Sequence, residues 1–451
     1  MSTKTTIVTE ETESITDDVS QEEVPEKESV DDDKLAALKA KLKAKSEDDM
    51  PAKIVEKKTR SIRFGVIGSG QAGSRLSATY YKHGYPAVAI NTATQDLEHI
   101  QLPESNKLLL DFGLGGAGKD LEIGHSAAET YRDSINELVH NQLSEAQLII
   151  FCTSLGGGSG AGSAEVIVDI LSKMEMPVVV MTVLPMSTDD AQTKHNAITT
   201  LSKFTKMAKN RVIDNLIVVD NAKIESIYRD VGPLNFFSVS NEAIVDPIDQ
   251  FNTLSSQASD VKGLDPTEFG KLFTDGQGLT VCGTMTVPNF SEDTAIAEAV
   301  VENLSGSLLA AGFNLKQARY AGAIFVANKK VWNQIPNSSI NYAMSMINDV
   351  CGTPLGVFRG IYTVDMEEDV VKVYSMFSGL GLPDDRINQL KNEAKERMAT
   401  ADQKDEERNL NLKIDVGEET ISEADSIKKK IQAKKSAFGK LHGKAVIDRR
   451  K

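Results

Sequence analysis

The sequence feature that most constrains the fold is a run of small residues, TSLGGGSGAGS, at Thr153–Ser163. An apolar, β-rich run from Leu148 to Cys152 precedes it, and a helical pattern from Glu165 to Met174 follows it. Glycine permits positive φ angles and close backbone approach, and the N-terminus of a helix offers backbone N–H groups and a favourable dipole to an anion. The pattern therefore predicts a phosphate-binding loop rather than a flexible surface loop.

Two further glycine clusters strengthen the prediction of a nucleotide site. GSGQAGS at Gly68–Ser74 follows a predicted buried strand, and GLGGAG at Gly113–Gly118 precedes a helix predicted over 126–141. No Lys-Ser or Lys-Thr pair follows the glycines of the main run, which excludes a Walker A loop. The GxGxxG spacing at Gly68 also suits a dinucleotide, but the next strand, Ala87–Ile90, is followed by Asn91 rather than an acidic residue for a ribose. Three glycine-rich loops favour a nucleotide with several phosphates over a dinucleotide with one pyrophosphate.

Composition limits the class of protein. The chain has 451 residues, 40% of them hydrophobic, which leaves room for two or three domains with cores. A formal net charge of -15 argues against a whole-surface affinity for nucleic acid or an anionic membrane. The three cysteines are far apart and lie in or near apolar runs, so we expect reduced, buried thiols and a cytoplasmic location. No apolar run is long enough to suggest a transmembrane segment, which predicts a soluble protein.

The three glycine-rich segments together resemble the phosphate loops of the tubulin and FtsZ superfamily of GTPases. The resemblance runs in register from about residue 62 to residue 287, and more weakly to about residue 377. It implies GTP or GDP as the bound nucleotide. The residues that it assigns to the three phosphate loops are Gly68, Gly70, Gln71, Ala72, Gly73, Gly115, Gly116, Ala117, Gly118, Lys119, Gly156, Gly157, Gly158, Ser159, Gly160, Ala161 and Gly162.

The resemblance also implies contacts to the sugar and base. Asp189, chosen over Asp190, matches the ribose loop, and Asn221 matches the position that contacts sugar and base. Asn241, expected to open a helix over 241–255, matches the residue that reads guanine, although a lone Asn is also a common turn or cap residue. Mg²⁺ is expected with the nucleotide, but its ligands are not assigned. The chain has Ala93 where FtsZ has an aspartate, and Thr193-Lys194 where an arginine is expected.

Hydrolysis needs a group that activates water, which backbone amides do not supply. Asp265 and Glu268, in KGLDPTEFGKLF, resemble the synergy loop of the family and are the predicted catalytic residues. In the family this loop reaches the nucleotide of the neighbouring subunit, so catalysis requires assembly. The same two acids also fit an N-cap aspartate followed by a first-turn glutamate, a common capping pattern. Gly263 stands where the motif usually has asparagine.

The predicted fold is α/β, with a Rossmann-like parallel-sheet GTPase domain, a long central helix and a second α/β domain with a mixed sheet. Disordered N- and C-terminal tails are expected, the first acidic and the second ending in a basic stretch over 428–451, with a helix over 384–398 before it. The predicted divisions are an N-terminal tail (1–60), a GTP-binding domain (61–240), a central helix and connection (241–262), a C-terminal assembly domain (263–380) with the catalytic loop 263–268, and a charged helix with a basic tail (381–451).

The sequence thus predicts a GTP-hydrolysing cytoskeletal protein of prokaryotic, plasmid or phage type that polymerises head to tail into filaments. Its main partner is expected to be a second copy of itself, with an adaptor protein or nucleic acid at the basic C-terminal tail. Two alternatives remain open. One is a GTP-binding scaffold or regulator of the same fold that makes no dynamic filaments, and the other, less favoured, is an NAD-linked enzyme.

Overall fold

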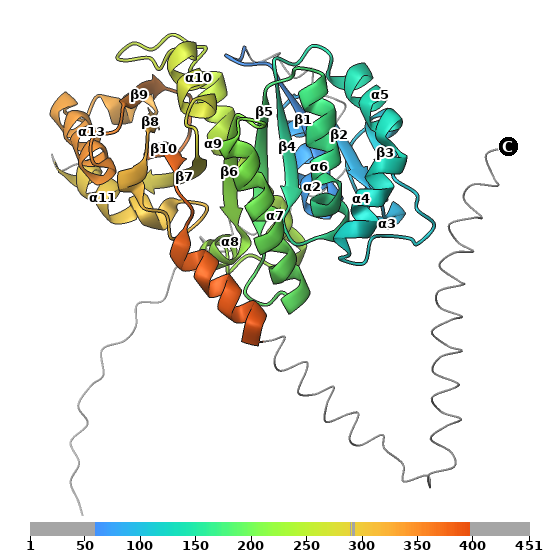
Figure 1. The fold of residues 1–451 in the computed structure, drawn as a ribbon. Helices are drawn as coiled ribbons and strands as arrows, with labels where there is room; N and C mark the ends of the chain where they lie inside the picture. The colour runs from blue at the N-terminus through green and yellow to red at the C-terminus, as the bar shows by residue number, and fades with distance from the viewer. Residues whose placement is uncertain (1–58, 289, 291–293, 397–451) are drawn as a thin grey trace, which may run out of the picture. The chain divides into compact units, whose positions relative to one another are not determined.

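The computed structural model describes residues 59–288, 290 and 294–396. Within this part of the chain, ten strands form one sheet in the order β3-β2-β1-β4-β5-β6-β7-β10-β8-β9 (Figure 1). The strands are β1 (Phe64–Ser69), β2 (Ala87–Asn91), β3 (Lys107–Leu109), β4 (Leu148–Ser154), β5 (Val178–Leu184), β6 (Asn215–Asp220), β7 (Leu279–Val287), β8 (Tyr320–Ala327), β9 (Gly356–Thr363) and β10 (Val371–Leu380). Pairing is parallel from β3 to β7 and antiparallel on both sides of β10, and β8 and β9 are parallel. The predicted α/β fold with a mixed sheet is confirmed. Strands β7 to β10, where parallel and antiparallel pairing are mixed, belong to the same sheet as the parallel strands.

Helices cover both faces of this sheet. They are α2 (Gly70–Lys82), α3 (Thr94–Glu98), α4 (Leu121–Thr130), α5 (Arg132–Leu143), α6 (Gly158–Lys173), α7 (Ala191–Lys209), α8 (Asn221–Ile227), α9 (Pro233–Leu254), α10 (Pro266–Thr274), α11 (Ala295–Ser307), α12 (Lys329–Trp332) and α13 (Asn337–Cys351), with 3₁₀ turns η1 (Glu104–Asn106) and η2 (Leu315–Gln317). A further helix spans 384–396, as predicted for this region. The predicted long central helix is α9.

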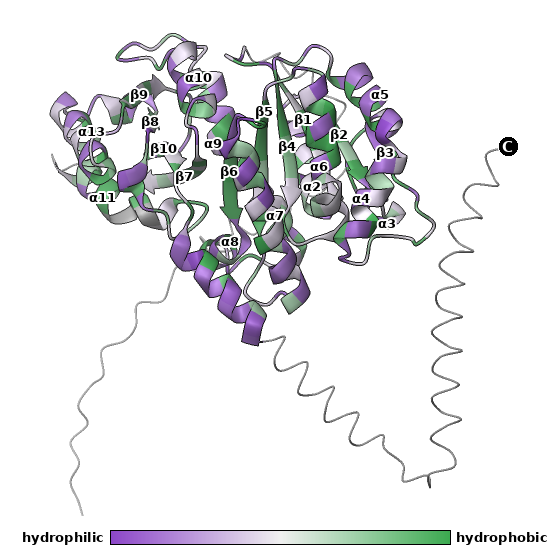
Figure 2. Cartoon of the chain, viewed as in Figure 1, coloured by the Kyte–Doolittle hydropathy of each residue, from purple (hydrophilic) through white to green (hydrophobic). Residues whose placement is uncertain are grey.

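The alternation of side chains along each strand builds two cores. Val66 of β1 packs with residues of α2, α9 and α10 on one face, and its neighbour Ile67 packs with residues of α5, α6 and α7 on the other. Successive side chains of a strand point to opposite faces, so a parallel sheet buried on both sides needs near-continuous apolar strands. Figure 2 shows this pattern, with the hydrophobic colour concentrated on the central strands and the hydrophilic colour on the outer helices.

Three helix boundaries differ from the sequence prediction. The helix predicted over 126–141 is two helices, α4 and α5, which meet at Tyr131. Helix α6 begins at Gly158 rather than near Glu165, so the later glycines of the main run are helical. Helix α9 begins at Pro233, whose fixed φ suits the first helical position, and Asn241 therefore lies in its third turn instead of opening it.

The predictions for the cysteines and for membrane-spanning segments can also be compared with the structure. The three cysteines are free and buried, as predicted. Among the described residues no helix is both long and apolar enough to cross a membrane. The expected acidic N-terminal tail and the basic stretch over 428–451 lie outside the described residues.

A buried ionic cluster joins α2 to α9. The carboxylate of Asp249, with 1% of its side chain exposed, accepts hydrogen bonds from Tyr85 Oη at 2.8 Å and pairs with His83 Nδ1 at 2.8 Å. His83 Nε2 lies 2.5 Å from Glu242 Oε1. The hydrogen bond to Asp249, and next the one to Glu242, raise the pKa of His83 to about 9.

This cluster predicts a pH dependence of stability. The pKa of His83 is higher in the folded protein than in the unfolded chain, so its stabilisation is complete below pH 6.5 and is lost as the pH rises through about 9. The loss corresponds to roughly 2–3 kcal/mol of unfolding free energy. Urea titrations between pH 6 and pH 10 are expected to show the unfolding free energy of the wild type falling as the pH rises. His83→Gln should lack the part of this fall that comes from His83. His140→Gln, on the exposed side of α5, is the control and should follow the wild type. An unchanged decline in His83→Gln would contradict this assignment.

Candidate nucleotide site

The candidate site lies at the carboxyl ends of β1, β4, β5 and β6, the edge at which open α/β sheets bind ligands. Its floor is made of glycines whose backbones touch. A Cβ on Gly160 would lie 2.6 Å from Thr153 Oγ1 and 2.7 Å from the Ser69 carbonyl oxygen. One on Gly70, at φ +71°, would lie 2.8 Å from the Gly160 nitrogen. Side chains are therefore excluded, and the starts of α2 and α6 meet directly.

The first turn of α6 forms the part of this floor that best suits an anion. Gly157 is the N-cap, no side chain caps the helix, and the first turn holds no acidic residue. The first N–H groups of an α-helix have no intrahelical partner, so this end combines bare donors with the positive end of the dipole. Ser159 is fixed beside it, because its hydroxyl lies 2.5 Å from Thr92 Oγ1 after β2.

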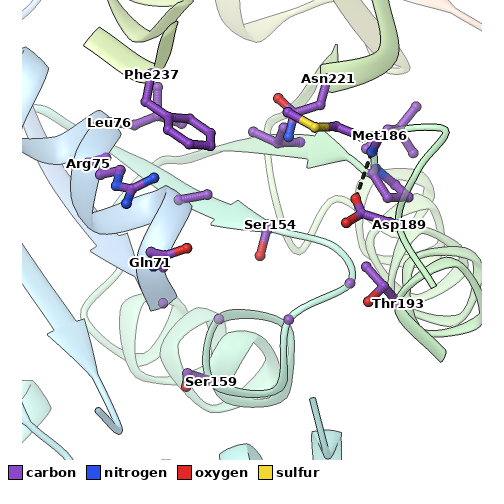
Figure 3. Close-up of a pocket in the computed structure, with 18 of the residues that line it drawn as sticks. Gln71, Arg75, Leu76, Ser154, Ser159, Met186, Asp189, Thr193, Asn221 and Phe237 are labelled. Atoms are coloured by element: carbon purple, nitrogen blue, oxygen red, sulfur yellow. Dashed lines mark hydrogen bonds between the residues drawn. The ribbon is translucent and has the colours of Figure 1, made fainter. Parts of the chain in front are cut away.

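A cavity of about 450 Å³ opens above this floor, which is within the usual range for small-molecule sites. Figure 3 shows its two walls. Gln71, Arg75 and Phe237 lie on one side, and Asn221, Met186 and Asp189 lie on the other. Of the residues predicted to bind nucleotide, those that line the cavity are Gly70, Gln71, Ala72, Lys119, Gly156, Gly157, Gly158, Ser159, Gly160, Asp189, Asn221 and Asn241.

The other predicted residues of the phosphate loops do not line the cavity. Gly68 and Gly73 pack β1 against α2, since a Cβ on Gly68 would lie 2.2 Å from the Gly73 carbonyl oxygen. Gly162 contacts α4 in the same close manner, and Ala161 is buried. The remaining predicted residues outside the lining are Gly115, Gly116, Ala117 and Gly118.

The loop before α4 keeps a strained backbone close to the site. Gly115, Gly116, Gly118 and Lys119 all have φ between +56° and +148°, the region that favours glycine. The Lys119 side chain reaches the cavity and pairs with Asp190. Burial raises the pKa of the Asp190 carboxyl, but the hydrogen bonds from Lys119 and Thr193 outweigh it and lower the pKa to about 2. Asp190 is thus an anion at neutral pH.

The segment after β5 separates the two neighbouring aspartates. Asp189 lines the cavity, and its Oδ2 accepts a hydrogen bond from the Met186 backbone N–H at 2.8 Å (Figure 3). Asp190 instead caps α7 through the Thr193 N–H. Thr193 lines the cavity, whereas the Lys194 side chain is fully buried elsewhere. Of this aspartate pair, Asp189 is therefore the one that lines the cavity.

Phe237 and Arg75 are among the residues that line the cavity without having been predicted. Phe237 lies one helical turn before Asn241 on α9, and the guanidinium of Arg75 sits 4.4 Å from the centre of its ring. An aromatic face beside a polar amide is a natural binding surface for a flat base. The four-residue spacing to Asn241 was the available signal, and it was missed because the helix was expected to start at Asn241.

The predicted catalytic acids lie far from this cavity. They flank the start of α10, at the opposite edge of the view from α8 and the carboxyl ends of the strands (Figure 1). Both belong to a capping box, in which Asp265 Oδ1 accepts from the Glu268 N–H at 2.8 Å and Glu268 Oε2 accepts from the Asp265 N–H at 3.2 Å. The capping alternative is therefore realised, with Asp265 exposed and Glu268 half-buried.

Comparison with known proteins identifies the family. Residues 63–229 match the model of the tubulin/FtsZ family GTPase domain, and residues 250–391 match the C-terminal domain of tubulin/FtsZ-like TubZ proteins. The chain is 24% identical over 354 residues to the tubulin-like protein TubZ of Bacillus cereus, covering 72% of this chain and 80% of the relative. It is 28% identical over 257 residues to cell division protein FtsZ 2 of Methanocaldococcus jannaschii, covering 55% and 63%.

Solved structures share the fold. A GTPγS-form protofilament of Bacillus thuringiensis serovar israelensis TubZ gives a TM-score of 0.69 at 20% identity, covering 76% of this chain and 94% of that one. GTPγS-bound CetZ2 of Haloferax volcanii gives 0.63 at 22% identity, covering 76% and 100%. The two family matches follow one another along most of the described chain, and the glycine floor lies within the first. The chain belongs to the tubulin/FtsZ family of GTPases and carries a TubZ-like C-terminal domain.

Proposed function

We propose that this protein binds GTP in the cavity above α6 and polymerises head to tail. GTP is hydrolysed when Asp265 and Glu268 of one subunit meet the nucleotide of the next. The observation that carries the proposal is the separation of the two halves of the site, since one chain holds its cavity and its acids at opposite ends (Figure 1). Such a chain completes its chemistry only with a second copy. Solved structures of TubZ as protofilaments and as a two-stranded filament support this proposal.

The nucleotide fits the cavity in one direction. The phosphates lie on the bare amides at the start of α6, the ribose lies against Asp189, and guanine lies between Phe237 and the amides of Asn221 and Asn241. An amide side chain can both donate to and accept from a purine edge. Arg75, already held over the Phe237 ring, lies on the same wall.

Mg²⁺ accompanies the triphosphate in this proposal. It usually keeps several waters and takes one or two carboxylates plus phosphate oxygens. Among the described residues, no group of three or more His, Cys, Asp or Glu side chains is arranged to hold a metal. Asp96 lines the cavity on the side of Gln71, whose Nε2 donates to its Oδ1 at 2.9 Å. Asp96 is thus the carboxylate that fits a contact to the hydrated ion.

Exposed apolar side chains at both ends support a contact between copies. At the cavity end, Leu234 is 97% exposed and Phe237 is 43% exposed. At the other end, Val261 is 61% exposed in the connection before α10. A contact between such unlike surfaces does not close on itself and generates a filament. One solved TubZ is described as a type III plasmid segregation protein, and we propose plasmid segregation as the process served here.

A second candidate function has one observation in its favour. Both predicted catalytic carboxylates already accept backbone N–H groups within their own capping box, as they would in a protein that uses them only for structure. A GTP-binding scaffold without dynamic filaments is the corresponding function. An adaptor or nucleic acid bound by the basic stretch over 428–451 remains a proposal for either function.

Sedimentation with different nucleotides tests the proposed function. The full chain is incubated with GTP, GTPγS, GDP or NAD and centrifuged, while phosphate release is followed in parallel. We expect pelleting and phosphate release with GTP, lasting pelleting with GTPγS, and a soluble protein with GDP or NAD. GTP binding without pelleting at any concentration would instead support the scaffold.

A further inference from the structure

The helix over 384–396 is packed at the cavity end of the molecule. It lies near α7 and α8 in Figure 1. Its buried face consists of Arg386, Ile387, Leu390 and Ala394, each no more than 6% exposed. Ile387 and Leu390 belong to the same core as Leu201 of α7. Two ion pairs on this helix, the first buried and the second half-buried at Glu393, are not among the contacts of the nucleotide site described above.

The first pair joins Arg386 to the carboxyl end of β6. Its Nε donates to Asp220 Oδ2 at 2.6 Å, and its Nη2 donates to Asp220 Oδ1 at 3.2 Å and to the Pro185 carbonyl oxygen at 3.1 Å. Asp220 Oδ1 also accepts the Ala222 N–H at 3.0 Å and so caps α8, whose first residue is Asn221. One guanidinium therefore holds both the start of α8 and the start of the segment 185–190.

The second pair reaches the same segment from its other end. Lys194 of α7 has no exposed side-chain surface, and its Nζ lies 2.6 Å from Glu393 Oε2. The same Nζ donates to the Ser187 carbonyl oxygen at 2.7 Å. Burial raises the pKa of the Glu393 carboxyl, but the neighbouring Lys194 ammonium outweighs it and keeps the pKa below its usual value.

Stabilisation of the fold does not by itself explain why these two ion pairs are present. Taking charges out of water is costly, and apolar side chains of similar size often stabilise a fold equally well or better. Both pairs, however, end on backbone carbonyls of the segment that carries Met186 and Asp189 into the cavity. Charge-assisted hydrogen bonds to carbonyls fix a loop more narrowly in direction than apolar contacts do.

We propose that Arg386 and Glu393 are positioning residues for the ribose side of the nucleotide site. The helix over 384–396 holds segment 185–190 and the start of α8 in the arrangement that accepts the sugar. Neither residue lines the cavity, so each acts through the groups it holds. The inference rests on the proposed nucleotide binding and adds the C-terminal helix to the site. Coupling of this kind is reciprocal, so bound nucleotide also stabilises the docked helix.

The test compares GDP with 2′,3′-dideoxy-GDP, which lacks the ribose hydroxyls, by calorimetry on the full chain. The wild type is expected to bind GDP about tenfold more tightly than the dideoxy form. In Glu393→Gln, GDP affinity should fall about tenfold while affinity for the dideoxy form changes little. In Arg386→Gln, which also releases Asn221 at the start of α8, both affinities should fall, that for GDP by about tenfold more. The ratio of the two dissociation constants then approaches one. Lys395→Gln, an exposed charge on the same helix, should keep the wild-type ratio.

Ile387→Val separates positioning from packing. It trims the same buried face without touching either ion pair, so it should lower stability and leave the ratio unchanged. Glu393, with 23% of its side chain exposed, carries the test if Arg386→Gln does not fold. A wild-type ratio in the folded variants, or an equal loss for both nucleotides, would overturn the inference. Equal affinity of the wild type for GDP and the dideoxy form would also overturn the inference. A wild type that binds neither nucleotide would instead refute the proposed function itself.

Discussion

Glu268→Gln is expected to bind GTP with wild-type affinity, to slow phosphate release by about 10²–10⁴-fold, and to give longer-lived filaments. Glutamine at this position of a capping box can still accept the Asp265 N–H, so the start of α10 is preserved. The substitution removes the negative charge and the capacity to take a proton from water. Phosphate release, measured together with light scattering, separates turnover from assembly.

The capping box makes the choice of variant important. Glu268→Ala would remove the cap as well as the acid, and a slow variant would then have two explanations. Asp265→Asn retains an N-cap side chain and, like Glu268→Gln, is expected to slow phosphate release. Asp260→Asn neutralises another exposed carboxylate in the same connection and should turn over normally. Wild-type turnover in Glu268→Gln would show that the acid serves only the cap.

Gly160→Ala is expected to weaken GTP binding by roughly a hundredfold, because each displaced amide loses a charge-assisted hydrogen bond of about 1.5–3 kcal/mol. The added methyl would lie 2.6 Å from Thr153 Oγ1 and 2.7 Å from the Ser69 carbonyl oxygen, so the start of α6 must move away from β1. Overpacking of this kind also lowers the free energy of unfolding by about 1–3 kcal/mol. Equilibrium dialysis with GTPγS measures the affinity directly.

Gly306→Ala is the matched control. Gly306 lies within α11, and no heavy atom comes within 4 Å of a Cβ placed there. Alanine should therefore leave nucleotide affinity unchanged and raise helix stability by about 1 kcal/mol. If Gly160→Ala bound GTPγS as tightly as Gly306→Ala, the floor of the cavity would not be the phosphate site.

The sequence predicted the strands and the glycine floor because both depend on local patterns. Runs such as Leu148–Cys152 are apolar enough to be buried strands, and glycine-rich turns after them are easily recognised. The start of α6 was misplaced because glycine has a low helix propensity. Tertiary contacts override that propensity here, since Gly158 must lie against the amides of Lys119 and Asp120, where a Cβ would come within 2.9 Å.

The wall of the cavity was harder to predict. Asn241 resembles a helix cap locally, but α9 starts at Pro233, eight residues earlier in the chain, which also concealed Phe237. The pairing of Arg386 with Asp220 spans 166 positions, and many other charges could have been paired with either residue. Only the three-dimensional arrangement shows that Lys194, at a position where the family has an arginine, is buried against Glu393.

The central claim is that one subunit supplies the cavity and the next supplies the acids. Mixing two inactive variants tests it most directly. Glu268→Gln keeps its cavity but lacks the acid, and Gly160→Ala keeps the acid but leaves its cavity mostly empty at a GTP concentration that saturates only Glu268→Gln. We expect an equal mixture to release phosphate from GTP faster than the sum of the two variants measured alone, because the acids of Gly160→Ala meet the GTP of Glu268→Gln. Phosphate release that merely equals that sum would contradict a site shared between subunits.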